Sequence, residues 1–210
     1  MPDRALARFV LATANAHKAR ELAEILGDDV VLLPRPPDVA EVDETASTLE
    51  GNARLKAQAL VAATGEAAIA DDTGLEVDAL GGRPGVHSAR YAGSDSDAVA
   101  NVAKLLDELR AADAASPAER AARFRTVIVA LWPDGREVVV EGVVDGSIAE
   151  QPRGAGGFGY DPVFVPDGDG GLTFAELSAE AKHAISHRGR AARALAAELA
   201  VPAGRPPEHP

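Results

Sequence analysis

The residues best suited to chemistry follow a short apolar segment, residues 67–70, that is typical of a buried strand. Asp71 and Asp72 come directly after it, followed by the hydroxyl of Thr73 and a glycine. Adjacent carboxylates repel each other, and a divalent cation with oxygen ligands is a common way to compensate them. A solvated turn is the ordinary explanation of an isolated Asp-Asp pair. The pair therefore predicts a metal site only if other ligand-type residues accompany it.

A second candidate is a polar turn between the apolar run 9–12 and a helical pattern that ends at Gly27. Asn15 is a suitable N-cap for this helix. A helix N-terminus presents backbone N–H groups to an anion, and Lys18 adds a full positive charge. The turn therefore predicts a phosphate site, although ordinary capping with a solvated lysine is the alternative. Its residues are Thr13, Ala14, Asn15, Ala16, His17 and Lys18.

An acidic loop follows a strand expected at residues 30–33 and a proline-rich break. Glu41, Asp43 and Glu44 lie close together in this loop. They could supply a second oxygen ligand to a metal held by Asp72, or they could be solvated charges.

A glycine-rich loop, residues 154–162, carries two aromatic rings. Flat rings on a mobile backbone are good stacking surfaces for nucleic acid bases. The alternative is a loop whose rings fold back onto the core. The candidate residues are Phe158, Gly159, Tyr160 and Asp161.

Cations gather near the end of the chain, at Lys182, His187 and Arg188. Ser186 is a suitable N-cap for a helix that runs to about Leu199, so the last two cations fall in its first turn. Positive charge is unfavourable there because it opposes the helix dipole. This placement favours a ligand.

The remaining elements are interpreted as scaffold. A helix begins in the capping-box run 47–50, ends at Gly65 and carries Lys56, which gains interest only from its neighbours. The β-branched runs 124–131 and 138–144 predict a hairpin, because Pro, Asp and Gly lie between them.

Composition limits the classes of function. The chain has 210 residues, 46% of them hydrophobic, a formal net charge of −12 and no cysteine. The acidic balance argues against a nucleic-acid partner, because that affinity depends on clustered Lys and Arg. The absence of cysteine excludes disulfides and thiolate chemistry, and we expect no membrane partner, since no run approaches the ~20 apolar residues of a span. With no signal peptide evident, we expect a cytoplasmic protein with a single domain over residues 1–200 and a disordered Pro-rich tail over 201–210.

Together these features are the parts of a nucleotide site. An anion turn, carboxylates suited to Mg²⁺, a stacking loop and late cations favour hydrolysis of a phosphoanhydride. The chain has no Walker A lysine motif and no dinucleotide glycine fingerprint, so the common nucleotide-binding folds are not indicated.

Five motifs in order resemble the inosine triphosphate pyrophosphatase family, from about Phe9 to Leu199. They are Thr13-x-Asn15-x-x-Lys18, Ala70-Asp71-Asp72-Thr73-Gly74-Leu75, Gly81-Gly82-x-Pro84-Gly85-Val86-x-Ser88-Ala89-Arg90, Gly157-Phe158-Gly159-Tyr160-Asp161-Pro162 and Ser186-His187-Arg188. The resemblance implies an α/β fold with an elongated central mixed β-sheet flanked by helices, and two lobes around a substrate cleft. It also implies a homodimer and magnesium-dependent cleavage of the nucleoside triphosphates ITP, dITP or XTP to the monophosphate and pyrophosphate.

The resemblance also implies roles for individual residues. Asp72 is the proton acceptor and a magnesium ligand, Thr73 contacts substrate, and residues 13–18 hold the phosphates. Phe158 stacks on the base with Gly159, Tyr160 and Asp161 beside it, and Lys182, His187 and Arg188 complete base recognition. Relatives often have Glu where this chain has Gly51, so an acidic role there passes to Glu50 or is absent. For the second metal ligand we favour Asp43 or Glu41.

Three other readings remain to be compared. A nucleotide-sensing module would bind the same ligand without turnover, and a related pyrophosphatase would act on other modified or ordinary nucleotides. A substrate panel separates these two from the main hypothesis. A glycosidase would need two acids set apart across a sugar cleft, which the adjacent Asp71 and Asp72 fit poorly.

Overall fold

The fold is built on one seven-stranded mixed sheet with strand order β2-β1-β3-β5-β6-β7, in which β4 pairs with β3. We describe it from a computed structural model that covers residues 7–13, 15–27, 30–93, 97–168 and 170–200. β1 is parallel to β2 and β3, and the other pairs are antiparallel. The strands are β1 Ala7–Leu11, β2 Val30–Leu33, β3 Ala68–Val77, β4 Pro84–Gly85, β5 Ala121–Leu131, β6 Glu137–Ile148 and β7 Phe164–Pro166.

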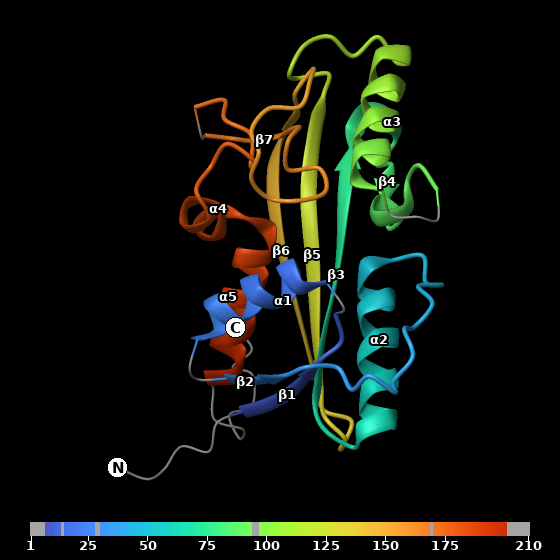
Figure 1. Ribbon diagram of the computed structural model, residues 1–210, viewed down its shortest axis with the longest axis vertical. Coiled ribbons are helices and arrows are strands. Elements are labelled where there is room, and N and C mark those ends of the chain that lie inside the picture. Colours follow the sequence, from blue (N-terminus) through green and yellow to red (C-terminus); the bar gives the residue numbers. More distant parts are fainter. Residues whose placement is uncertain (1–6, 14, 28–29, 94–96, 169, 201–210) are drawn as a thin grey trace, which may run out of the picture.

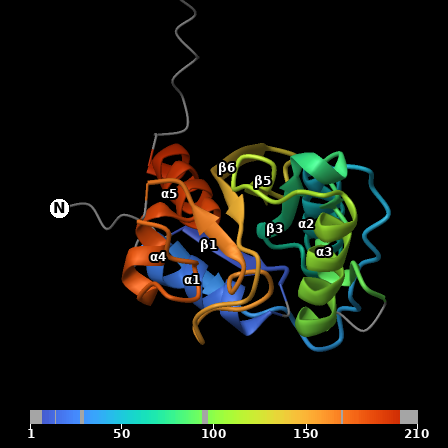
Figure 2. The same ribbon diagram turned by 90° about the horizontal axis from the view of Figure 1, so that it is seen from above.

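Helices cover both faces of this sheet, as Figures 1 and 2 show. Residues of β5 alternate between the faces: Val127 and Val129 pack in the cluster under α2, whereas Ile128 and Ala130 pack in the cluster under α1 and α5. The helices are α1 Ala16–Leu26, α2 Leu49–Thr64, α3 Ala98–Ala111, α4 Ala179–Ile185 and α5 His187–Ala200, with short 3₁₀ turns η2 Asp78–Leu80 and η3 Ser88–Arg90.

Two lobes share the long strands β3, β5 and β6, which run almost the length of the molecule in Figure 1. One lobe has a core of α3, η2 and β7 packed on the ends of these strands, with Leu105, Phe124 and Phe164 buried in it. The other contains β1, β2, α1 and α2. The expected α/β fold with a central mixed sheet is therefore confirmed.

On the side of β3 that faces β1 and β4, strand pairing is interrupted in the middle of the strand. β1 pairs with it only as far as Ile69, and β4 pairs with it from Leu75 onward. The four residues Asp71–Gly74 thus have β5 on one side and, among the described residues, no strand on the other. Such a gap in the pairing along a strand leaves room for a ligand between the lobes.

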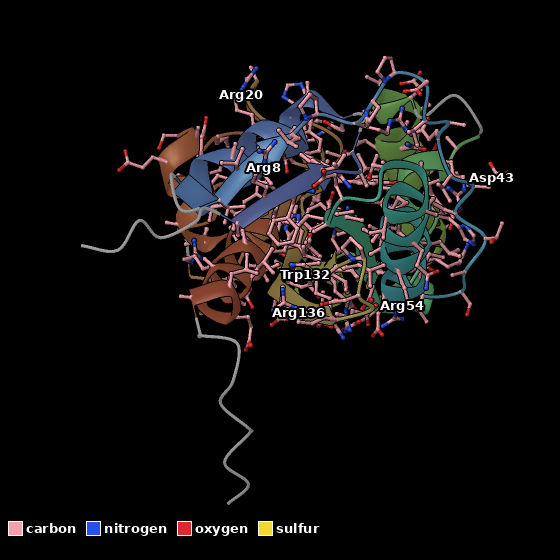
Figure 3. The ribbon with its side chains drawn as sticks, turned by 90° about the horizontal axis from the view of Figure 1, so that it is seen from below. Arg8, Arg20, Asp43, Arg54, Trp132 and Arg136 are labelled. Atoms are coloured by element: carbon pink, nitrogen blue, oxygen red, sulfur yellow. The ribbon has the colours of Figure 1, made fainter. Side chains whose placement is uncertain are left out.

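Several local predictions are confirmed. The side chain of Asn15 caps α1 and Gly27 ends it, while Gly65 ends α2 in the left-handed conformation. The hairpin of β5 and β6 is present and longer than the pattern suggested. Trp132 and Arg136, labelled side by side in Figure 3, lie in the turn of this hairpin, and the Trp132 ring packs edge-on against Phe9 at 5.1 Å between ring centroids.

Two expectations are corrected. The cap of α2 is Thr48, whose hydroxyl accepts from the Gly51 amide at 3.0 Å, and not Ser47. The strand expected at 67–70 does not end at the two aspartates but continues to Val77, because β5 pairs with every residue from Ala68 onward. The tail at 201–210 lies outside the described residues. None of the described helices is long and apolar enough to span a membrane.

Candidate active site

Asp71 and Asp72 do not act as a pair, because successive side chains of a strand point to opposite faces of the sheet. Asp71 faces α1 and α5, where Lys18 lies 3.0 Å from its carboxylate. Asp72 faces α2, where Lys56 lies 3.0 Å away. The two carboxylates therefore do not share one compensating cation, since each aspartate has its own partners.

Asp72 is held on the α2 side of the sheet by two donors. Lys56 donates to one carboxylate oxygen, and the side-chain amide of Asn52 donates to the other at 3.2 Å. Burial raises the pKa of Asp72, with Lys56 opposing the effect. Lys56 also donates to Glu44 at 2.9 Å, so one ammonium joins the two carboxylates.

Glu44, and not Asp43 or Glu41, is the loop acid that lies beside Asp72. Glu44 and Asp72 line the same cavity, whereas Glu41 and Asp43 are exposed and line a neighbouring one. Figure 3 shows Asp43 at the outer margin of the molecule. Glu50 pairs with Arg54 at 2.6 Å on the exposed side of α2 and takes no part in the site.

The turn before α1 is only partly in the cleft. Asn15, His17 and Lys18 line the cavity that contains Asp72, whereas Thr13 and Ala16 line a separate one with the Pro34–Pro37 segment. The Asn15 side chain accepts from the amides of His17 and Lys18, so the cap itself engages these donors. Ala14 lies outside the described residues.

The late cations form a buried network with Glu21 of α1. Glu21 accepts from Lys182 at 3.2 Å and from Arg188. Although burial acts to raise it, the pKa of Glu21 is lowered by these two cations. Lys182 also donates to Asp161 at 2.8 Å, and Arg188 reaches the Thr73 hydroxyl at 3.1 Å. The structure thus joins α1, the glycine-rich loop, α5 and β3 at one point.

His187 occupies a buried position at the start of α5. Its ring stacks on Phe124 at 4.5 Å between centroids, and its Nδ1 atom has no partner among the described residues. Burial, and then the charge of Arg188, lower its pKa well below the ordinary value. α5 comes this close to the sheet because Gly142 of β6 lies against the His187 carbonyl, where a side chain would clash.

The two aromatic rings of the glycine-rich loop, Phe158 and Tyr160, lie in different environments. Phe158 is half-buried in the cleft, with the His17 ring stacked on it at 5.3 Å and Lys182 at 4.9 Å from its centroid. Tyr160 folds back into the core, and its hydroxyl donates to the Ser88 carbonyl at 2.9 Å. Asp161 accepts from the Phe158 amide at 2.7 Å, which fixes the turn. Phe158 alone is therefore placed to stack on a ligand.

One cavity of about 350 Å³ gathers most of the predicted residues. Sequence reasoning missed Glu21, Asn52 and the Thr126 hydroxyl that pairs with Thr73. No spacing pattern marks these residues, because their partners are distant in the chain. The predicted residues in the cavity are Asn15, His17, Lys18, Asp72, Thr73, Phe158, Gly159, Tyr160, Asp161, Lys182, His187 and Arg188.

The donors around Asp72 suit a magnesium–nucleotide complex better than a closed metal centre. Among the described residues no three His, Asp or Glu side chains converge as a metal site would require. Mg²⁺ usually keeps several waters and binds one or two carboxylates together with phosphate oxygens. Asp72 and Glu44, which share the ammonium of Lys56, offer two such carboxylates. The residues present therefore fit this ion.

An α/β cleft in which Lys18 and Lys56 lie beside two adjacent aspartates is suited to a phosphorylated ligand, and comparison with known proteins identifies the family. The chain belongs to the Ham1 family, whose model matches residues 9–198. The resemblance seen in the motifs is thereby confirmed.

Relatives with assigned activities are similar over nearly their whole length. The chain is 51% identical to the dITP/XTP pyrophosphatase of Nitratidesulfovibrio vulgaris, over 90% of this chain and 94% of that one. It is 49% identical to the dITP/XTP pyrophosphatase of Streptomyces avermitilis, over 90% and 96%. Among solved structures, a HAM1 protein from Coxiella burnetii superposes with a TM-score of 0.84 at 39% identity, covering 92% of this chain and 98% of that one.

Proposed function

We propose that this protein hydrolyses non-standard purine nucleoside triphosphates (ITP, dITP or XTP) to the monophosphate and pyrophosphate, with Mg²⁺ as cofactor. The observation that carries the proposal is the position of Asp72. It lies at the interruption of the β3 edge, next to Lys56 and in the same cavity as Lys18 and Phe158. The names of the relatives support the same reaction.

The base end of the substrate lies against Phe158, with Lys182 and Arg188 near the ring. Inosine and xanthosine carry a 6-oxo acceptor that these donors satisfy. Adenine presents a 6-amino donor to the same donors, and a buried mismatch of this kind costs ~1–3 kcal/mol. The cleft therefore prefers a 6-oxopurine to adenine.

The phosphate end lies between the start of α1 and Lys56. Lys18 and Lys56 supply positive charge, and in the free protein they are paired with Asp71 and Asp72. Asp72 accepts a proton from the attacking water. Burial raises the pKa of both Asp72 and Asp161 in the cleft, but Asp72 lies beside Lys56 at the phosphate end, whereas Asp161 is paired with Lys182 at the base end. Asp72 and Glu44 would hold Mg²⁺ when it is bound, and the ion would offset the charge that develops on the leaving pyrophosphate.

The reaction is tested by measuring pyrophosphate release from ITP, XTP, GTP and ATP, with and without Mg²⁺. We expect release from ITP and XTP that requires the metal. Asp72→Asn keeps the shape of the side chain but removes the base, so kcat should fall by ~10²–10⁴. Nucleotide binding without product, or full activity of Asp72→Asn, would contradict the proposal; the first result would instead indicate a sensing module.

The second magnesium ligand can be tested by a matched pair of variants. Glu44→Gln should raise the Mg²⁺ concentration needed for half-maximal activity, because it removes a carboxylate beside Asp72. Asp43→Asn removes the same charge from the exposed side of the same loop and should leave that concentration unchanged. A larger effect of Asp43→Asn than of Glu44→Gln would instead support Asp43, which the sequence analysis favoured, as the second ligand.

We also propose the homodimer and the cytoplasmic location expected from the sequence. Light scattering coupled to gel filtration tests the first, with a mass near twice that of one chain as the expected result. Fractionation of cells that produce the protein tests the second.

A further inference from the structure

The segment Gly81–Arg90 forms one of the five sequence motifs, yet it has no role in the reaction described above. It ends at Arg90, whose guanidinium reaches across to the acidic loop. One guanidinium nitrogen donates to the Glu44 carboxylate at 2.9 Å, and another donates to the Glu44 backbone carbonyl at 3.1 Å. Arg90 therefore holds both the side chain and the backbone of one residue.

The loop that carries Glu44, residues 34–48, contains no helix or strand. Val39 of this loop packs on the cluster of Val10, Leu60 and Ala68, and the polar links of residues 44–46 converge on the neighbourhood of Asp72. The Ala46 amide donates to Asn52, whose side chain also donates to Asp72. The Glu44 carboxylate accepts from Lys56, which also contacts Asp72. The loop is thus held near the cleft by side chains rather than by pairing of its backbone.

Arg90, in contrast, is presented by a rigid platform. The Ser88 hydroxyl accepts from the Leu75 amide at 2.8 Å and donates to the Gly85 carbonyl at 2.6 Å, which fixes η3 to β3. The Ala89 carbonyl accepts from Asn101 of α3 at 2.9 Å. A residue fixed in this way can orient a less constrained neighbour.

Lys56 alone cannot give Glu44 a fixed position, because the same ammonium serves Asp72 and lies at the phosphate end of the cleft. An ammonium is also a point charge with no preferred plane, whereas a guanidinium donates in a fixed fork. The fork of Arg90 engages two acceptors of Glu44 at once, which sets its direction as well as its distance.

We propose that Arg90 is a positioning residue that holds Glu44 beside Asp72 in the orientation needed to bind the metal. This inference rests on the proposed function, because it takes Asp72 and Glu44 as the metal-binding carboxylates. Arg90 contacts neither metal nor substrate in this role.

The experiment compares Arg90→Gln and Arg90→Lys with Arg83→Gln. Arg83 lies in the same segment but pairs with Glu108, so its variant is a matched control for the lost charge. Binding of Mn²⁺ is followed by electron paramagnetic resonance, without substrate. We expect Arg90→Gln to raise the Mn²⁺ dissociation constant ~10-fold or more, as loss of an outer-shell partner does. Arg90→Lys should give an intermediate value, and Arg83→Gln the wild-type value.

Hydrogen exchange without metal gives a second measurement that needs no activity. Peptides covering residues 41–47 should exchange faster in Arg90→Gln than in the wild type and in Arg83→Gln. If Arg90→Gln fails to fold, Arg90→Lys carries both measurements. Faster exchange with unchanged Mn²⁺ affinity would overturn the inference, because Arg90 would then be structural only.

A double-mutant cycle separates positioning from direct phosphate binding. In a Glu44→Gln background, Arg90→Gln should cause no further loss of Mn²⁺ affinity, since the side chain that it orients is gone. An additional loss, or a raised KM for nucleotide that persists at saturating metal, would overturn the inference. Failure of the wild type to bind Mn²⁺ without substrate would be seen before any variant and would overturn this inference, whereas Mg²⁺-dependent release of pyrophosphate would still support the proposed function.

Discussion

The two ends of the cleft are built differently. At the base end the charged side chains are almost fully buried, with exposures of 7% for Lys182, 4% for Asp161 and 2% for Arg188. At the phosphate end, where we propose the metal binds, Asp72 is equally buried at 7%, but the groups around it are more open, with exposures of 15% for Lys56, 24% for Glu44 and 36% for Arg90. Both ends use ion pairs, but at this end the partners of the buried aspartate reach solvent.

This difference follows from the task of each end. Discrimination between purines requires donors that do not adapt to the wrong base, and the base end obtains them by packing α1 and α5 against the sheet. In the proposed reaction Lys56 must exchange partners during each turnover, because it is paired with Asp72 and Glu44 in the free protein. Groups on a loop near solvent can be reorganised at lower cost than groups in a core.

The largest loss of folding stability is expected when Glu21, the acid at the centre of the base end, is neutralised. Glu21→Gln leaves Lys182 and Arg188 buried with less compensation. Removal of one partner from a buried ion pair costs ~3–5 kcal/mol of folding free energy. Urea unfolding should show a loss of this size. Glu24→Gln, on the exposed side of the same helix, should show little change.

A Glu→Gln substitution at the phosphate end should have a smaller effect on stability. Glu44→Gln removes a partly exposed carboxylate, and such pairs contribute ~0–1 kcal/mol to stability. Its effect should appear in metal binding and not in the unfolding curve. Equal losses of stability for Glu21→Gln and Glu44→Gln would show that the two ends are equally buried and would remove the contrast.

A smaller effect is expected at Phe158, the aromatic ring of the base end. Phe158→Leu keeps an apolar side chain but removes the stacking face, and a stacked ring contributes ~1–3 kcal/mol per base. Steady-state assays with ITP should therefore show a KM raised roughly 10-fold with kcat largely retained. Phe158→Tyr keeps the ring and should stay near the wild type; an equal loss in both variants would argue against stacking.

Local sequence signals predicted the parts of this fold that depend on near neighbours. The Asn15 cap, the Gly27 and Gly65 stops and the hairpin of β5 and β6 all follow from residue type and spacing. The length of β3 did not, because two aspartates look like the end of a strand. Their burial is possible only because β5 pairs with them and lysines from two helices reach them.

The identity of the charge partners was also beyond local reasoning. Glu21 and Arg188 are 167 positions apart, and Glu44 and Arg90 are 46 apart. The sequence narrowed the second acid to one loop, but the choice of Glu44 over Asp43 depends on which way that loop faces. The burial of His187 was likewise unexpected, since a histidine at a helix start suggests an accessible group.

The burial of His187 leads to the prediction with the smallest expected effect, a change of stability with pH, which tests whether water reaches the base end. Burial, followed by the charge of Arg188, lowers the pKa of His187, so the folded protein keeps this ring neutral in mild acid. The unfolded chain protonates it near its ordinary pKa of about 6.5. As the pH falls below this value the unfolded state binds a proton that the folded state does not, so stability is lost. Linkage for one such group predicts a loss of about 1 kcal/mol between pH ~6.5 and ~5.5.

His187→Gln lacks the group, so urea unfolding across this range should show a shallower fall of stability than in the wild type. Parallel curves would mean that the ring is protonated in the folded protein, and hence that water or an acid reaches the base end.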